Sequence, residues 1–456
     1  MEWGPSVQRL INHTLERSWQ FQERLEELKS VPYLSKAPPR FLELVGGLLL
    51  SIRETLIDYN RIFSETTENE VHEALFHRIQ SLSSVLAEFY FLLSSVEFSR
   101  TIRNPASISL PMESLANQVA PDSLVIIYPS YVCNYSYFNV VEHLRDRRYS
   151  QFFSPQLLDK YPKYFAVITF PDILKNNILS HANIGHELGH LFIDYKDITS
   201  EALEEIHEFK LEISRRDLER FFEEYVADIV SVCLFGPASF FALAEFGGSV
   251  IRFEQPTYTH PPLVFRFKNI VDTLREYGHE DFFKKNKNTS PAARKLHSAL
   301  ELWKNSAEEL CQKTYKLTKA GNIFTALQVS LEKARQLVGQ KVHSDHQLQL
   351  QDNIFDCVNL IEEGIPPSSY LNQQGLMKNS CEQVKLGTIL NAAWLYRVWK
   401  FEKKRKFGSA DEVREYMENL SHLSRLTQKA VEQSETIARY RKAKKTDKKK
   451  EEGGDS

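Results

Sequence analysis

Cysteine is scarce in this sequence, and its placement excludes two kinds of structure. The chain of 456 residues has five cysteines, an odd number, and none of them stands in a CxxC pair. A disulfide framework needs paired cysteines and a cysteine-based zinc site needs closely spaced ones, so we expect neither. The scattered cysteines instead indicate a reducing, cytoplasmic location. They are Cys133, Cys233, Cys311, Cys357 and Cys381.

A membrane-spanning run, a signal peptide and a strong net charge are also missing. One apolar run, Phe41 to Ile52, is too short to cross a bilayer, and Gly236 and Pro237 interrupt the other, Val230 to Phe246. The N-terminus is acidic and polar where a signal peptide would be basic and then apolar. A formal net charge of -3 predicts no general affinity for nucleic acid. We therefore expect a soluble protein without a membrane span and without specific nucleic-acid binding.

Hydrophobic patterning divides the chain into four regions. Residues 1–105 and 286–440 read as helical, because apolar residues recur at intervals of three and four. Residues 106–285 contain the best strand candidates, SLVIIYPSYV (123–132) and KYFAVITF (163–170), followed by further helices. The charged, glycine-ended stretch 441–456 is expected to be disordered. The predicted fold class is mainly α with a small β-sheet (α+β).

The stretch ANIGHELGHLFID, residues 182–194, contains the strongest chemical signal. In a helix, His186 and His190 lie about 40° apart around the axis, so both imidazoles point to the same side. Glu187 lies about 100° away, where it can contact a water molecule on a metal ion without binding the ion itself. This is the HExxH arrangement of zinc hydrolases.

Two further properties of this helix support a buried metal site. Gly185 and Gly189 lie four apart beside the histidines, and each glycine inside a helix costs roughly 1 kcal/mol relative to alanine. Because this cost needs a compensating reason, we expect the backbone of another segment to approach the helix closely at these glycines. Another face of the helix is apolar, which predicts burial and hence a need for partners to the histidines. The apolar residues are Ile184, Leu188, Leu191 and Phe192.

A second helix, RFFEEYVADIV (220–230), supplies the expected third ligand. Glu224 and Asp228 are four apart and share one face. A hydrolytic zinc site has three protein ligands and an open position. Glu224 is the predicted third ligand, and Asp228 is predicted to accept a hydrogen bond from a ligand histidine. Glu223 is the competing choice, but it lies off that shared face.

Two other metal patterns fit less well. The extended motif HExxHxxGxxH would require glycine at position 193 and histidine at position 196, where the chain has Ile193 and Lys196. Asp194, one turn after His190, is an alternative carboxylate ligand without a supporting motif. We otherwise interpret it as a polar residue at the end of the helix.

HELGH followed by EEYVAD resembles the gluzincin metallopeptidases, especially the group that contains the membrane heat-shock protease and the CAAX prenyl endopeptidases. Members of that group also have a His-Pro segment, here THPPLVFR (259–266), and the resemblance covers roughly residues 160–275. It implies a zincin-like core with an active-site helix and an edge strand. It also implies Zn²⁺ as the cofactor and a peptide or protein as the substrate.

Residue by residue, the resemblance implies His186, His190 and Glu224 as zinc ligands, Glu187 as the general base, and Asp228 as the partner of a ligand histidine. The expected reaction is hydrolysis of a peptide bond by a metal-activated water molecule. This sequence departs from the group in two ways: the transmembrane helices are absent, and the long helical flanks have no recognisable counterpart.

Other residues around the motif carry weaker expectations. Tyr258 and His260 are candidates for stabilising the oxyanion, although His260 also suits a helix cap. Arg266 is expected either to pair with an acidic group of the site or to be exposed. The stretch Tyr164–Phe170 is expected either to be an edge strand that lines the cleft or an ordinary core strand. His181 is interpreted as structural.

These observations leave three interpretations of function open. The first is a soluble zinc endopeptidase, whose helical flanks control access or bind a regulatory partner. The second is a catalytically silent helical scaffold or regulatory protein that retains a zinc site. The presence of Glu187 favours catalysis, because structural zinc sites usually have four protein ligands and need no adjacent carboxylate. The third is a peptidase that is latent until a partner is cleared from its cleft.

Overall fold

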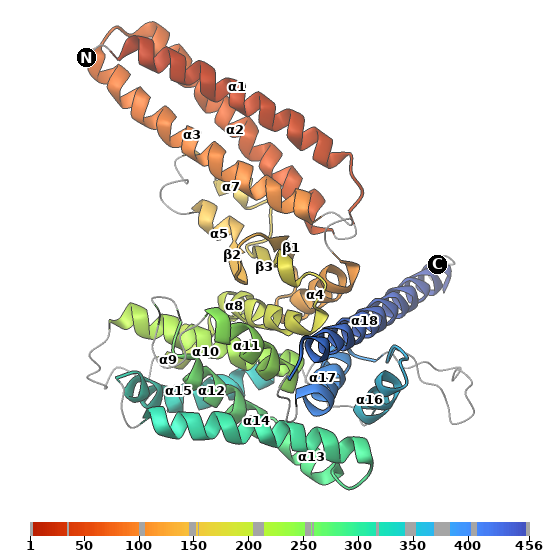
Figure 1. Cartoon of the computed structure of the whole chain (residues 1–456). Coiled ribbons are helices and arrows are strands. Elements are labelled where there is room, and N and C mark those ends of the chain that lie inside the picture. Colours follow the sequence, from red (N-terminus) through yellow and green to blue (C-terminus); the bar gives the residue numbers. More distant parts are fainter. Residues whose placement is uncertain are drawn as a thin grey trace.

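The computed structural model describes residues 3–33, 36–99, 105–145, 152–153, 155–203, 214–250, 257, 260–315, 319–342, 353–368, 384–402 and 408–452. Over these residues the protein is mainly helical, with one small sheet of three strands (Figure 1). The predicted fold class, mainly α with a small β-sheet, is confirmed.

Three long helices form the N-terminal region. They are α1 (Gly4–Lys29), α2 (Ala37–Glu65) and α3 (Asn69–Phe98), and they form a bundle that projects from the rest of the molecule (Figure 1). α2 has proline in its first turn, where the missing N–H costs nothing. The apolar faces of the three helices meet in one hydrophobic cluster. The same cluster includes residues of the sheet, such as Ile126 and Phe165, so the core of the bundle extends beyond residue 105.

α3 is long and apolar enough, by length and composition, to cross a membrane, and it is the one such helix among the described residues. In the bundle, 53% of its most apolar stretch is buried. The core helix of a soluble protein has the same properties, so this finding does not assign a compartment.

The sheet has the strand order β1, β3, β2. β1 (Leu124–Ser130) runs parallel to β3 (Phe165–Pro171), and β2 (Ser136–Asn139) runs antiparallel to β3. Both predicted strands form, whereas β2 was not predicted. The expectation that the second strand lies at the edge is wrong, because β3 pairs on both sides. Its almost continuous burial is what a central strand requires. The edge strand that contacts the helix α8 (Ile184–Lys196) is β2.

The sheet separates two hydrophobic cores. Because side chains alternate along a strand, Ile126 and Phe165 pack with the N-terminal bundle, whereas Ile127 and Ile168 pack with the helices that follow. The sheet is therefore shared by both halves of the molecule.

The candidate site lies among α8, α10 (Arg215–Phe235), α11 (Pro237–Val250) and α12 (Leu263–Glu276). The other described elements are α4 (Ala106–Val119), α5 (Val140–Arg145), α7 (Pro155–Leu158), η1 (Asp172–Leu174), η2 (Ile178–Asn183), α9 (Ile198–Leu203), α13 (His279–Asn286), α14 (Pro291–Tyr315), α15 (Lys319–Lys341), α16 (Ile354–Glu362), α17 (Leu386–Arg397), the π-helical turn η4 (Val398–Glu402) and α18 (Ala410–Glu452).

Regions 106–285 and 286–440, which the sequence patterning separated, share one core. The hydrophobic cluster runs from Ile108 in α4 to Val431 in α18. Aromatic stacking crosses the predicted boundary: Phe265 of α12 stacks on Phe324 of α15, with ring centroids 5.2 Å apart. No core boundary therefore lies between residues 285 and 286.

The expected disordered tail begins as helix. α18 continues without a break through residues 441–452, and its C-terminal end extends beyond the body of the protein (Figure 1). Lysine, glutamate and alanine favour helix, and a helix that already exists extends without the cost of nucleation. Composition therefore did not indicate the helical structure of residues 441–452. Residues 453–456 lie outside the described residues.

Two C-terminal helices hold the segment that leads into α8. Trp394 Nε1 of α17 donates a hydrogen bond to the carbonyl oxygen of Leu179 in η2 at 2.9 Å. Ser424 Oγ of α18 donates to the carbonyl oxygen of Asn176 at 2.7 Å. The start of α8 is therefore positioned by C-terminal residues. Trp394 comes 215 residues after Leu179, and Ser424 comes 248 residues after Asn176.

Acid should destabilise the protein through His181 in η2, whose ring is fully buried against Phe170. Burial lowers the pKa of His181 to about 3, from its usual 6.5. As the pH falls, His181 therefore binds a proton in the unfolded chain at a higher pH than in the folded protein. The free energy of unfolding is highest above pH 6.5 and decreases as the pH falls toward 3. From pH 8 to pH 5 this residue alone should lower the free energy of unfolding by about 2 kcal/mol.

The measurement is urea unfolding of H181L and of the wild type at both pH values. H181L should lose that part of the pH dependence, whereas replacement of the exposed His13 by leucine should leave it unchanged. An H181L protein with the wild-type pH dependence would contradict the assignment.

Candidate metal centre

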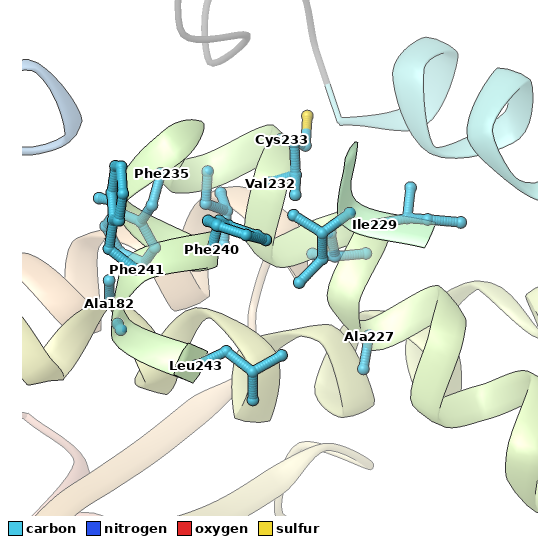
Figure 2. Packing of buried hydrophobic residues seen from close by; sticks show 14 of the residues in the cluster. Ala182, Ala227, Ile229, Val232, Cys233, Phe235, Phe240, Phe241 and Leu243 are labelled. Carbon is cyan, nitrogen blue, oxygen red and sulfur yellow. The ribbon is translucent and has the colours of Figure 1, made fainter. Parts of the chain in front are cut away.

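α8 lies closer to α10 than ordinary side chains would allow. A Cβ atom at Gly189 would come within 2.6 Å of Ala227 Cα, and one at Gly185 would come within 2.6 Å of the Phe235 ring. Phe235, at the end of α10, belongs to the same hydrophobic cluster as Phe240 and Phe241 of α11 (Figure 2). The predicted close approach is therefore present, with a backbone at Gly189 and with side chains at Gly185.

This close approach brings together three potential ligands. The ligand atoms of His186, His190 and Glu224 all lie within 4.8 Å of one another. His186 Nε2 lies 3.3 Å from Glu224 Oε2, and His190 Nε2 lies 3.6 Å from Glu224 Oε1. Zinc–ligand distances of about 2.0–2.1 Å place tetrahedral ligand atoms about 3.3 Å apart. The observed spacing therefore suits a single zinc ion.

One buried oxygen atom of this cluster lacks a well-placed hydrogen-bond donor. Glu224 Oε2 is buried and has no donor in hydrogen-bond geometry among the described residues, although His186 Nε2 lies 3.3 Å and Arg266 Nη1 lies 3.5 Å from it. Buried carboxylate oxygens normally have a partner, and a cation between Glu224 and the two imidazoles would supply it. The residues thus fit a zinc ion. Histidine and carboxylate ligands also suit other divalent transition metals, so the choice of zinc belongs to the proposal below.

His186 is held by a carboxylate that is itself held by a buried arginine. Asp228 Oδ1 lies 3.0 Å and Arg266 Nη2 lies 3.1 Å from His186 Nδ1, and His186 Nε2 lies 3.3 Å from Glu224 Oε2 and 3.4 Å from Arg266 Nη2. Arg266 of α12 donates two hydrogen bonds to the same carboxylate, from Nε to Oδ2 at 2.8 Å and from Nη2 to Oδ1 at 2.6 Å. Arg266 and Asp228 are each only 2% exposed. Of the two outcomes considered for Arg266, pairing is the one observed.

Burial and charge shift the pKa values of the ligand groups in different directions. Burial and the charge of Arg266 lower the pKa of His186, but the neighbouring carboxylates of Asp228 and Glu224 outweigh them and raise it to about 9. Burial and the neighbouring His186 lower the pKa of His190 to about 4. Burial alone would raise the pKa of Glu224, but His186 and Arg266 hold it well below its usual range. The cluster therefore contains an ionised carboxylate and a neutral imidazole at neutral pH.

Glu187 stands beside this cluster without joining it. Its side chain is buried and lines a cavity together with His186, Asp228 and Arg266. Burial raises the pKa of Glu187 to about 7. Glu187 therefore lines the same cavity as one potential ligand, His186, and its contact with a metal-bound water molecule stays a prediction.

Of the two candidates for stabilising the oxyanion, the structure describes His260. His260 Nε2 lies 3.7 Å from Glu224 Oε2, and its side chain lines the same cavity as Glu187. The backbone of His260 also forms a turn with Thr257, through hydrogen bonds in both directions. Tyr258 lies outside the described residues.

The competing carboxylates lie elsewhere. Asp194 accepts a hydrogen bond from Tyr137 Oη at 2.6 Å and is not part of the ligand cluster. Glu223 is also outside the cluster, and burial raises its pKa to about 7. Tyr137 itself was missed by the sequence analysis. Its ring stacks on His190, with centroids 6.2 Å apart, but it lies on the unpredicted strand β2 and no local signal marks it.

No protein-family model, no curated protein and no solved structure matches this chain. The resemblance to gluzincins therefore rests on the motif residues alone.

Alanine at Gly189 should separate α8 from α10. The new methyl group would meet the backbone of Ala227, which cannot rotate away, so we expect destabilisation by about 1–3 kcal/mol and weaker metal binding. Gly46→Ala in α2 is the matched control, because its Cβ would meet only side-chain atoms, of Leu25 at 3.3 Å and of Lys29 at 4.0 Å. Urea unfolding and zinc titration measure both effects. A G189A protein as stable as wild type would show that the close approach imposes no constraint.

Replacing each of two adjacent glutamates by alanine tests the third ligand. Glu224→Ala should abolish stoichiometric zinc binding, because it leaves two imidazoles without the carboxylate between them. Glu223→Ala should bind zinc as the wild type does. The measurement is the metal content of purified, dialysed protein. Loss of zinc from the variant at 223 but not from the variant at 224 would reverse the assignment.

Proposed function

We propose that this protein is a zinc-dependent endopeptidase. In this proposal His186, His190 and Glu224 hold the ion and Glu187 is the general base. The observation that carries the proposal is the convergence of three ligand atoms within 4.8 Å, with the Glu187 side chain beside them facing a cavity. A purely structural zinc site would have four protein ligands, whereas only three residues converge among those described.

Zinc bound at these residues would polarise the peptide carbonyl and make a neighbouring water molecule more acidic. Glu187 takes a proton from this water and passes it to the amine that leaves. His260 lines the same cavity, and in this proposal it donates a hydrogen bond to the developing oxyanion. Tyr258 is retained as the second candidate for this role.

Asp228 and Arg266 have positioning roles in this proposal. Asp228 fixes the ring of His186 so that Nε2 is the atom offered to the ion. Arg266 keeps Asp228 ionised and in place, because its two hydrogen bonds and its charge compensate the burial of that carboxylate. Neither residue needs to touch the substrate for this effect.

The Glu187→Gln variant separates an enzyme from a silent zinc protein. Glutamine keeps the shape of the side chain but cannot accept a proton, so hydrolysis of unfolded protein substrates should fall by about 10²–10⁴-fold. Zinc content should stay stoichiometric, because Glu187 is not among the ligands. Glu223→Gln is the control and should keep wild-type activity.

Two results would speak against the proposal. Undiminished hydrolysis by E187Q would remove Glu187 from the mechanism. A wild-type protein that binds zinc and hydrolyses no peptide would leave the alternative function, a helical scaffold or regulatory protein with a retained zinc site.

A further inference from the structure

His190 is the less firmly held of the two imidazoles in the ligand cluster. Its side chain is 23% exposed, whereas that of His186 is 12% exposed. Asp228 and Arg266 both lie within hydrogen-bond distance of His186 Nδ1. No described residue forms a hydrogen bond with the His190 ring, whose nearest carboxylate, that of Glu224, lies 3.6 Å away. Because a ligand histidine normally has its second ring nitrogen held by a partner, the orientation of this ring depends on packing.

Two described aromatic rings pack against the His190 ring. The His186 ring meets it edge-on, with centroids 4.8 Å apart and planes at 85°. The Tyr137 ring of β2 stacks on it, with centroids 6.2 Å apart and planes at 23°. Stacked aromatic pairs have centroid distances of about 4.5–7 Å, so this is a favourable contact. His186 is itself a potential ligand, and Tyr137 therefore supports the cluster from outside.

The Tyr137 side chain is fixed at both ends. Its backbone pairs with Ile168 of the central strand β3, and its hydroxyl donates a hydrogen bond to Asp194 Oδ2 at 2.6 Å. Asp194 follows His190 by one turn on the same face of α8. Tyr137 thus contacts two successive residues of that face. A rotamer that moved its ring away from His190 would also move the hydroxyl away from Asp194.

The alternation of side chains along β2 directs Tyr137 to α8. Tyr137 packs against the hydrophobic cluster that contains α8, whereas the next residue, Phe138, packs against the cluster of the N-terminal bundle. β2 lies next to α8 (Figure 1). A shift of the strand register by one residue would exchange the two rings, and phenylalanine has no hydroxyl to offer Asp194. The register therefore brings the tyrosine to the ligand.

We infer that Tyr137 is a positioning residue for His190, and that Asp194 acts through Tyr137 by holding its hydroxyl. The inference rests on the metal centre of the proposed function. Tyr137 touches neither the ion nor the substrate in this role. It restricts the His190 ring to the orientation in which Nε2 faces the other ligands. Asp228 has the corresponding role for His186 through hydrogen bonding, whereas Tyr137 acts through stacking.

The test compares the metal-binding properties of full-length variants that are fully folded by circular dichroism. Tyr137→Leu removes both the stacking ring and the hydroxyl. Its dissociation constant for zinc, measured by competition with a chelator, should rise about tenfold or more, as for other residues that hold a ligand histidine. Co²⁺ binds the same kinds of ligand, and the visible spectrum of the Co²⁺-loaded variant should change, because that spectrum reports the geometry of the ligands.

Tyr164→Leu is the matched control. Tyr164 immediately precedes β3 and also packs against α8, but its ring meets Tyr195, with centroids 5.1 Å apart, rather than a ligand histidine. Y164L should lower the free energy of unfolding through lost packing. Its zinc affinity and its Co²⁺ spectrum should equal those of the wild type, which separates positioning of the ligand from general support of α8.

Two substitutions at Asp194 form a second test, which also serves if Y137L does not fold. Asp194→Ala leaves the tyrosine hydroxyl without its acceptor, so it should weaken zinc binding, although by less than Y137L because the ring remains. Asp194→Asn keeps an oxygen that accepts the hydrogen bond and should restore the wild-type affinity and spectrum. A neutral amide would not restore them if Asp194 bound the ion directly.

The outcomes separate this inference from the proposed function. Wild-type zinc affinity and an unchanged Co²⁺ spectrum in Y137L would overturn the positioning role and leave the metal centre intact. An equal change in Y164L, or zinc binding by D194N as weak as by D194A, would overturn it as well. A wild-type protein that binds zinc and hydrolyses no peptide would overturn the peptidase but not the role of Tyr137. A wild-type protein that binds no zinc would overturn both.

Discussion

The approach of α8 to α10 at Gly189 is the constraint on which the candidate site depends. His186 and His190 share a helix, so their relative position is set by helix geometry alone, but Glu224 comes from another helix and can reach them only if the two backbones nearly touch. Ala227, the residue in contact with Gly189, lies between Glu224 and Asp228 on α10. One contact therefore sets the position of both carboxylates relative to the two imidazoles.

Burying so many ionisable groups together is tolerable only because they are paired. Isolated charges in a protein interior are strongly unfavourable, and Arg266, Asp228 and Glu224 are all almost fully buried. Arg266 balances Asp228 through two hydrogen bonds and lies 3.5 Å from Glu224. The third helix, α12, thus completes the electrostatics of a site whose ligands come from α8 and α10.

The parts of this site that could be predicted from sequence are those determined within a single helix. The shared face of His186 and His190, the offset of Glu187 and the spacing of Glu224 and Asp228 all follow from 3.6 residues per turn. The two glycines signalled a close contact, although not its partner. Three features depend on contacts between distant segments, which local patterns do not encode. They are the strand order of the sheet, the position of Tyr137 beside His190, and the pairing of Arg266. For the same reason composition placed a boundary at residue 285 inside a continuous core, and assigned disorder to residues 441–452, which extend an existing helix.

The hydrogen bonds from Trp394 and Ser424 to the segment before α8 have a consequence for biosynthesis. Residues 186–266 contain the three potential ligands, Glu187, Asp228 and Arg266, yet the turn that starts α8 is held by side chains that leave the ribosome much later. A nascent chain that has passed residue 266 already carries all its reactive groups, but it still lacks the two helices that fix their scaffold. The order of translation therefore delays completion of the site until nearly the whole polypeptide has been made.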